Sequence, residues 1–296
     1  MSVSFRSLER PIVSPVAAVT GTPSAPAGGL QRSTRAGVGA LLILAVLNAA
    51  FLYFLPARAA TSYAWAIRPP ISAAFLGGGY LAGVVATALT VFAARRWRSI
   101  QPLAIALVTL SVGLLAATLL HTARFRWGYP PTWAWIGVYA LAPVGVTILA
   151  CRQRAITIRP SVADPRLRLL RLLSLVLGAT MLAGAIALFV FPAELGGDWP
   201  WPLTALLAQA VAAWCAMIAA ALLWCAYDLR RPHEALIPYA TLGCWCLALL
   251  ALLALPALHA GELTRTGVPL LSYLVALIAL LALAVLGVAR ATRLSR

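Results

Sequence analysis

Residues 203–227 read LTALLAQAVAAWCAMIAAALLWCAY and contain no charged side chain. A helix rises about 1.5 Å per residue and a bilayer core is about 30 Å thick, so about 20 apolar residues are needed to cross it. This run is long enough, and a helix satisfies its backbone polar groups internally. The stretch predicts a transmembrane helix and indicates the class of the whole fold.

Seven further segments have the same character. Together with residues 203–227, they give eight predicted spans, at residues 37–56, 71–94, 102–121, 133–151, 170–192, 203–227, 235–258 and 268–290. None of these segments alternates between apolar and polar residues as the strands of a membrane β-barrel do, so we expect an all-α membrane protein. Apart from Arg171 and Arg290, at the ends of the fifth and eighth spans, the spans as drawn contain no Asp, Glu, Lys or Arg, which argues against a coupled ion pump.

The composition excludes most soluble classes. Of the 296 residues, 62% are hydrophobic and 10% are charged, whereas soluble domains are about 25% charged. The net charge of +16 comes from arginines in short clusters between apolar runs, and a nucleic-acid-binding protein would gather them on one face. We expect the lipid bilayer as a partner and no nucleic acid.

The arginines indicate the orientation in the membrane. Eighteen lie in the two terminal segments and in the second, fourth and sixth connections, and five lie in the other connections. By the positive-inside rule, both termini face the cytoplasm, and an even number of spans agrees with this. We expect a multi-pass protein of the cell membrane.

Composition and internal similarity divide the chain into four parts. Residues 1–35 are rich in Ser, Pro, Gly and Ala, and this composition predicts a flexible cytoplasmic tail. Residues 36–151 hold the first four spans, residues 152–169 form an arginine-rich cytoplasmic linker, and residues 170–296 hold the last four spans.

The two sets of four spans resemble each other. Leu52–Ala57 (LYFLPA) ends the first span, and Leu188–Ala193 (LFVFPA) ends the fifth, 136 residues later. Trp65 and Trp201, before the second and sixth spans, have the same separation. These pairs predict two parallel four-helix repeats about a pseudo-two-fold axis along the membrane normal. The alternative is that apolar helices resemble one another by composition alone.

The outer connections are rich in aromatic residues mixed with proline. Two interpretations remain open, because tryptophan prefers the membrane interface while Pro-Pro and Trp-Pro pairs stiffen a loop. The first is an aromatic belt, and the second is a rigid vestibule for a ligand. The tryptophans expected at this face are Trp65, Trp127, Trp133, Trp135, Trp199 and Trp201.

Two histidines end equivalent spans. His121 and His259 lie at the outer ends of the third and seventh spans, where a pair could ligate haem iron or exchange protons. No Cys-x-x-Cys-His motif or carboxylate cluster accompanies them, and a histidine at this depth commonly bonds a helix end or water. We therefore expect no metal and no cofactor.

Other polar residues complete the candidate ligand site. Arg68 and Arg124 bring positive charge to the arginine-poor outer face, where they attract an anion or contact lipid phosphate. Asn48 and Gln209 are expected to face the bundle, where an amide finds a partner on another helix. The glycines of span two, at residues 77–79 and 83, predict close helix packing.

Parts of the chain resemble uncharacterised multi-pass membrane proteins of high-GC bacteria. The resemblance rests on Trp65–Gly77 (WAIRPPISAAFLG), Trp199–Thr204 (WPWPLT) and the segment His121–Trp135, and it covers residues from about 36 to 227. It implies a bacterial membrane protein with this fold. It implies no catalytic residue, because no activity is attached to that family.

Three functional hypotheses follow. The first is a protein that binds or transports a small molecule between the repeats near the outer face. Its candidate residues are His121, His259, Arg68, Arg124, Trp65, Trp135, Trp201 and Gln209. The second is an accessory protein that assembles with a membrane partner subunit or with copies of itself. The third is a haem-binding subunit. No motif of an enzyme occurs, so we expect no catalytic activity.

The absorption spectrum of the protein purified in mild detergent tests the haem hypothesis. A haem-binding subunit shows a Soret band, and the substitutions His121→Ala and His259→Ala then remove it if these side chains are the ligands. From the missing haem motifs we expect a colourless preparation. Such a preparation eliminates the haem-binding hypothesis.

Overall fold

A computed structural model describes residues 30, 32–154, 162–255 and 262–293. Its long elements are helices, and no strand occurs within these ranges. The eight long helices are α1 (Arg32–Phe54), α3 (Pro70–Phe92), α4 (Gln101–Leu120), α5 (Pro130–Arg154), α6 (Arg168–Val190), α8 (Ala205–Asp228), α9 (Leu236–Ala254) and α11 (Val268–Arg293). All eight are long and apolar enough to cross a membrane, which confirms the expected all-α class and span number.

Short helices occupy the connections. At the ends of the bundle lie α2 (Ala59–Ser62), α7 (Pro192–Gly196) and the 3-10 helices η1 (Pro56–Arg58), η2 (Trp97–Ser99), η3 (Thr122–Arg124), η4 (Pro165–Leu167) and η5 (Pro232–Ala235). Proline stands at the first turn of several of them, where its missing N–H costs no helical hydrogen bond.

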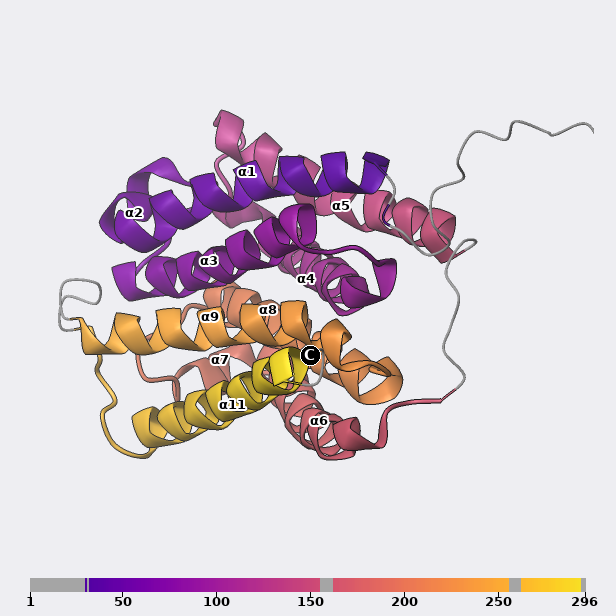
Figure 1. The fold of residues 1–296 in the computed structure, drawn as a ribbon. Helices are drawn as coiled ribbons and strands as arrows, with labels where there is room; N and C mark the ends of the chain where they lie inside the picture. Colours follow the sequence, from indigo (N-terminus) through magenta and orange to yellow (C-terminus); the bar gives the residue numbers. More distant parts are fainter. Residues whose placement is uncertain (1–29, 31, 155–161, 256–261, 294–296) are drawn as a thin grey trace, which may run out of the picture.

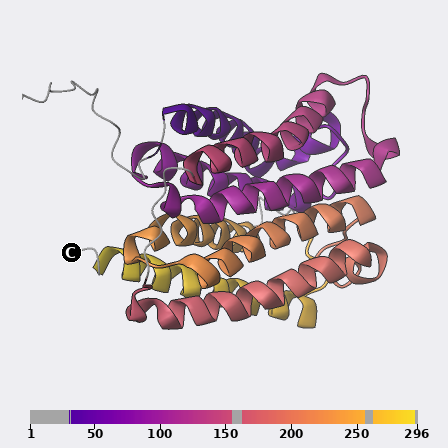
Figure 2. The same ribbon diagram turned by 90° about the vertical axis from the view of Figure 1, so that its right-hand side faces the viewer.

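The bundle has an inner group of four helices and two flanks. Figure 1 shows α1 and α5 on one side, α6 and α11 on the opposite side, and α3, α4, α8 and α9 between them; Figure 2 shows the same order from the side. The inner helices bury more of their apolar surface than the flanking ones. Contacts between α4 and α8, and between α3 and α9, join the first four long helices to the last four.

The helix ends differ from the expected boundaries by a few residues. The largest difference is at α1, which begins at Arg32, so four residues expected in the flexible tail belong to a helix. Arg35 explains this start, because its guanidinium donates to the carbonyl oxygens of Val91 (2.6 Å) and Ala94 (2.7 Å) at the end of α3. The rest of the expected tail lies outside the described residues, except Leu30, whose amide bonds the Arg95 carbonyl.

A buried ion cluster joins the ends of the inner helices. Arg98 in η2 donates to Glu234 Oε1 at 2.8 Å and to Asp228 Oδ2 at 3.1 Å. The other carboxylate oxygens are bonded too: Arg230 Nε donates to Asp228 Oδ1 at 2.8 Å. Glu234 Oε2 accepts from the backbone amides of Arg230 and Arg231. Asp228 and Glu234 lie just outside the spans drawn from the sequence, and the sequence analysis did not single them out.

The cluster is charged and nearly dry. The side chains of Arg98, Asp228 and Glu234 are only 7%, 4% and 4% exposed. Burial lowers the pKa of the Arg98 guanidinium, but the hydrogen bonds and charges of Glu234 and then Asp228 outweigh it, so this pKa is raised above its ordinary value. A buried charge is tolerated only when it is paired in this way.

Glycines allow α3 to approach its neighbours closely, as the sequence predicted. A Cβ on Gly77 would lie 2.4 Å from the backbone nitrogen of Tyr53 in α1, and one on Gly79 would lie 2.3 Å from the Trp214 ring in α8. At Gly83, on the same helix, a Cβ would meet its nearest neighbour at an ordinary 3.7 Å. The tight glycine contacts therefore lie in the first half of α3.

Replacing Arg98 should destabilise the protein strongly. The substitution Arg98→Gln leaves two buried carboxylates without their cation, and breaking a buried pair costs about 3–5 kcal/mol. The melting temperature of the detergent-purified protein measures the loss. Arg96→Gln, at an exposed arginine two residues away, is the control and should change it little; equal effects of the two substitutions would refute this role of Arg98.

A methyl group at Gly77 should also destabilise the bundle, through steric overlap. Gly77→Ala places a Cβ against the backbone of α1, which cannot rotate away as a side chain can, and overpacking typically costs about 1–3 kcal/mol. Gly83→Ala is the control on the same helix. Thermal unfolding that ranks the two variants equally stable would contradict the close approach of α1 and α3.

Candidate functional site

A cavity of about 550 Å³ lies inside the half of the bundle that contains α1 and α5. Residues of α1, α3, α4 and α5 line it, and α8 and α9 contribute the remaining wall. Its lining residues run from Thr34 and Trp97 at one end of the bundle to Tyr63 and Pro131 at the other. The cavity therefore extends along much of the length of the helices.

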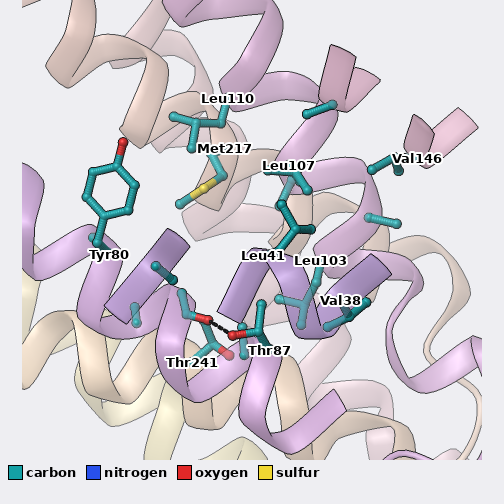
Figure 3. A pocket seen from close by; sticks show the side chains of 18 of the residues that line it. Val38, Leu41, Tyr80, Thr87, Leu103, Leu107, Leu110, Val146, Met217 and Thr241 are labelled. Carbon is teal, nitrogen blue, oxygen red and sulfur yellow. Dashed lines mark hydrogen bonds between the residues drawn. The ribbon is translucent and has the colours of Figure 1, made fainter. Parts of the chain in front are cut away.

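The wall of this cavity is almost entirely apolar. Figure 3 shows Leu103, Leu107 and Leu110 of α4, with Val38 and Leu41 of α1 beside them. Met217 of α8 and Val146 of α5 complete the labelled apolar residues. No charged side chain is among the described residues that line the cavity. An apolar wall of this kind binds apolar molecules, and it excludes ions because a charged group would lose its hydration there without gaining a partner.

Hydroxyl groups interrupt the apolar wall. Those of Thr87, Thr90 and Thr241 donate to carbonyl oxygens of their own helices, whereas tyrosine hydroxyls bond across helices. The hydroxyls of Tyr80 in α3 and Tyr139 in α5 are hydrogen-bonded to each other. Nearby, the Tyr63 hydroxyl donates to Oδ1 of Asn48 in α1 at 3.1 Å. These four residues all line the cavity. We call Tyr63, Tyr80 and Tyr139 the tyrosine cluster.

The Tyr63 hydroxyl is uncharged at neutral pH. Burial is the main cause that raises the pKa of Tyr63 well above its ordinary value, and the neighbouring Tyr80 raises it further. A phenol normally titrates near pH 10. The Tyr63 hydroxyl therefore keeps its proton under physiological conditions and acts as a neutral hydrogen-bonding group.

Packed rings hold the tyrosine cluster in place. Trp135 lies against Tyr139, with ring centroids 4.4 Å apart, and against Tyr63 at 5.7 Å. Trp214 packs edge-on to Tyr80 at 5.3 Å and reaches this position because Gly79 has no side chain. The rings contact one another directly, so the hydroxyls have little freedom to leave the cavity wall.

Two indole groups in the cavity wall have no hydrogen-bond partner among the described residues. Trp97 and Trp245 are 3% and 4% exposed, and the Nε1 atom of each is buried and unbonded. A buried N–H normally finds a partner, because leaving it unpaired costs free energy. Both residues line the cavity, but their Nε1 atoms have almost no exposed surface.

The tryptophans predicted at the outer face divide into two groups. Trp127 and Trp133 are exposed, as residues of an aromatic belt would be. Trp65 and Trp135 are buried, with ring centroids 4.6 Å apart. Trp201 is fully buried and donates to Ser72 Oγ at 3.0 Å. Of the seven candidate site residues that the structure describes, only Trp135 lines the cavity.

His121 and Gln209 are brought together. His121 Nε2 lies 2.9 Å from Gln209 Oε1, and Gln209 Nε2 donates to the carbonyl of Phe189 at 3.1 Å. Gln209 therefore faces the bundle as expected, and it connects the outer ends of α4, α8 and α6. The expected partner of His121, His259, lies outside the described residues.

The remaining candidates do not form a ligand site with these residues. Arg68 and Arg124 are exposed. The outer acids bond elsewhere: Glu262 accepts from the Ile71 amide at 2.9 Å, and Asp198 pairs with Arg265 at 3.1 Å. Across the described ranges, no three His, Cys, Asp or Glu side chains come together as a metal site would require.

The sequence analysis missed the tyrosine cluster and the cavity. Tyr80 stands within an apolar run and next to three glycines, and this combination is a signal that could have identified it. Asn48 was singled out and does line the cavity. The cavity itself leaves no pattern in the sequence, because six helices far apart in the chain form its wall.

Comparisons with protein-family models, with curated proteins and with solved structures found no match to this chain. Its function must therefore be argued from the geometry of its own residues.

Proposed function

We propose that this protein binds a hydrophobic small molecule within the membrane, in the cavity between α1, α3, α4 and α5. The observation that carries the proposal is a cavity of about 550 Å³ without a charged lining residue. Sites for small molecules typically enclose about 300–1,000 Å³ and are lined mainly by apolar and aromatic side chains with a few polar groups. The eight apolar helices support a multi-pass membrane protein around this site.

The proposal places the protein in a bacterial cell membrane with both termini in the cytoplasm. The support is the unequal division of the arginines between the two sides. Hydrogen bonds gather the arginine-rich segments at one end of the bundle: Arg35 bonds to Val91 and Ala94, and Arg290 bonds to the Arg166 carbonyl. The outer aromatic residues then lie at the opposite end.

We also propose that two four-helix units arose by duplication. Matching hydrogen bonds between outer connections support this: the Arg126 amide donates to the Ala64 carbonyl, and the Thr264 amide donates to the Pro200 carbonyl, both at 3.1 Å. Ala64 and Pro200 are 136 residues apart, and Arg126 and Thr264 are 138 residues apart. Shared apolar composition does not explain equivalent backbone bonds in loops.

The backbone conformation before equivalent helices supports the same relationship. Pro69 (φ −73°, ψ 167°) precedes α3, and Thr204 (φ −73°, ψ 160°) precedes α8. Arg96 (φ −129°, ψ 143°) precedes η2, and Arg231 (φ −126°, ψ 144°) precedes η5. The spacing is 135 residues in both cases. The packing agrees, because α1 packs on α3 as α6 packs on α8, and α4 packs on α8 as α9 packs on α3.

This correspondence explains why the cavity lies in the first unit. Tyr239 of α9 corresponds to Ala104 of α4, and Ser174 of α6 corresponds to Val38 of α1. In the second unit, the Tyr239 hydroxyl bonds Ser174 Oγ at 2.6 Å, and its ring packs against Gly287, where a Cβ would lie 2.2 Å away. In the first unit, Ala104 and Val38 both line the cavity. A tyrosine fills one unit, and an alanine leaves the other open.

An accessory role without a ligand is the alternative. A tightly packed apolar centre throughout the bundle would favour that role. The cavity favours binding.

Native mass spectrometry after mild detergent extraction tests the proposed binding. The wild-type protein should carry one hydrophobic molecule per chain. Ala104→Tyr should abolish this adduct, because it places in the first unit the side chain that fills the second. Val112→Tyr, at an exposed position of the same helix, should retain the adduct.

A second cavity variant guards against misfolding of the first. Gly145 lines the cavity, and a Cβ there would meet no atom within 4 Å, so a side chain at this position starts in open space, and Gly145→Phe adds a ring there. Loss of the adduct in both cavity variants, with unchanged thermal stability, supports binding in the cavity. A wild-type protein without an adduct, or an adduct that survives both substitutions, would overturn the proposal.

A further inference from the structure

We infer that the ligand is an uncharged lipid whose hydroxyl group binds to the tyrosine cluster. This inference rests on the proposed binding in the cavity and specifies the chemical class of the molecule. Three observations carry it: the depth of the cluster, the hydrogen-bonding capacity of its groups and the absence of charge from the lining that the structure describes.

The depth of the tyrosine cluster excludes a charged head group. Tyr80 is ten residues from the first residue of α3, and Tyr139 is nine residues from that of α5. At about 1.5 Å per residue, the Cα atoms of both residues lie about 14–15 Å from the ends at which these helices begin. A phosphate or carboxylate held at this depth needs a cation beside it, and the cavity wall supplies none.

The hydrogen-bonding capacity of the cluster matches an alcohol. Tyr63 donates its proton to Asn48, and one hydroxyl of the Tyr80–Tyr139 pair donates to the other, which leaves this pair one further phenolic proton. Each phenolic oxygen can accept as well as donate, so the cluster retains capacity of both kinds. An alcohol, which is itself donor and acceptor, can join such a chain of hydroxyls at either end. The apolar wall from Leu110 to Leu103 then covers the hydrocarbon chain (Figure 3).

Three probes with one hydrocarbon chain test the head group: 1-hexadecanol, hexadecane and hexadecyl phosphate. The full-length protein is placed in phosphatidylcholine nanodiscs, and binding is followed by native mass spectrometry and by the rise in melting temperature with probe mole fraction. Hexadecanol should bind about threefold to tenfold more tightly than hexadecane, as expected for one net hydrogen bond. Hexadecyl phosphate should bind most weakly, because its charge loses its hydration without gaining a cation.

Removing the hydroxyls should remove the preference but not the binding. In the double variant Tyr80→Phe/Tyr139→Phe, hexadecanol should bind no more tightly than hexadecane, whose own binding stays unchanged. Tyr239→Phe is the matched control, because it removes a buried hydroxyl that is paired with Ser174 and does not line the cavity. This control variant should keep the preference for hexadecanol.

The outcomes separate this inference from the proposal on which it rests. Equal binding of hexadecanol and hexadecane, tighter binding of hexadecyl phosphate, or a preference that survives the double substitution would overturn the inference and leave the proposed binding intact. If none of the three probes binds, the proposed binding fails, and the inference fails with it.

Discussion

The rest of the structure depends on the buried ion cluster of Arg98 with Asp228 and Glu234. Arg98 lies in the turn between α3 and α4, and its two partners lie in the turn between α8 and α9. The cluster joins two helix hairpins from opposite halves of the chain at one end of the bundle. Both carboxylates use their second oxygen on neighbouring arginines, so neither hairpin can shift without leaving a buried charge unpaired. The cavity wall is made from these same four helices and from α1 and α5.

Some parts of the bundle are closely packed and others leave open space. In α3, Gly77 and Gly79 admit the backbone of α1 and the ring of Trp214, which places the first half of the helix in direct contact with its neighbours. Under the proposed duplication, Ala104 leaves room in the first unit at the position that Tyr239 fills in the second. On this proposal, the difference between Ala104 and Tyr239 is enough for a ligand to bind in only one of the two four-helix units, because one aromatic ring occupies much of a small cavity.

Particular residues show how far the sequence could predict the fold and the site. The eight helices and the close packing at Gly77 were predictable, because run length and small residues act locally. Gln209 was expected to find a partner on another helix, but its bonds to His121 and Phe189 depend on how α4, α6 and α8 are arranged. Trp65 and Trp201 were expected at the interface, yet both are buried, because the connections that carry them fold back onto the helices.

By itself, the sequence determined the number of candidate spans, the helical class and the clustering of arginine in alternate connections. These properties follow from the free energy of placing each side chain in hydrocarbon or in water, which depends on that residue and its near neighbours. Only the tertiary structure decided the ion cluster, the tyrosine cluster and the cavity. Arg98 and Asp228 are 130 residues apart, and Tyr80 and Tyr139 are 59 apart. Such pairs meet only after the helices have packed, and a cavity is the space that this packing leaves unfilled.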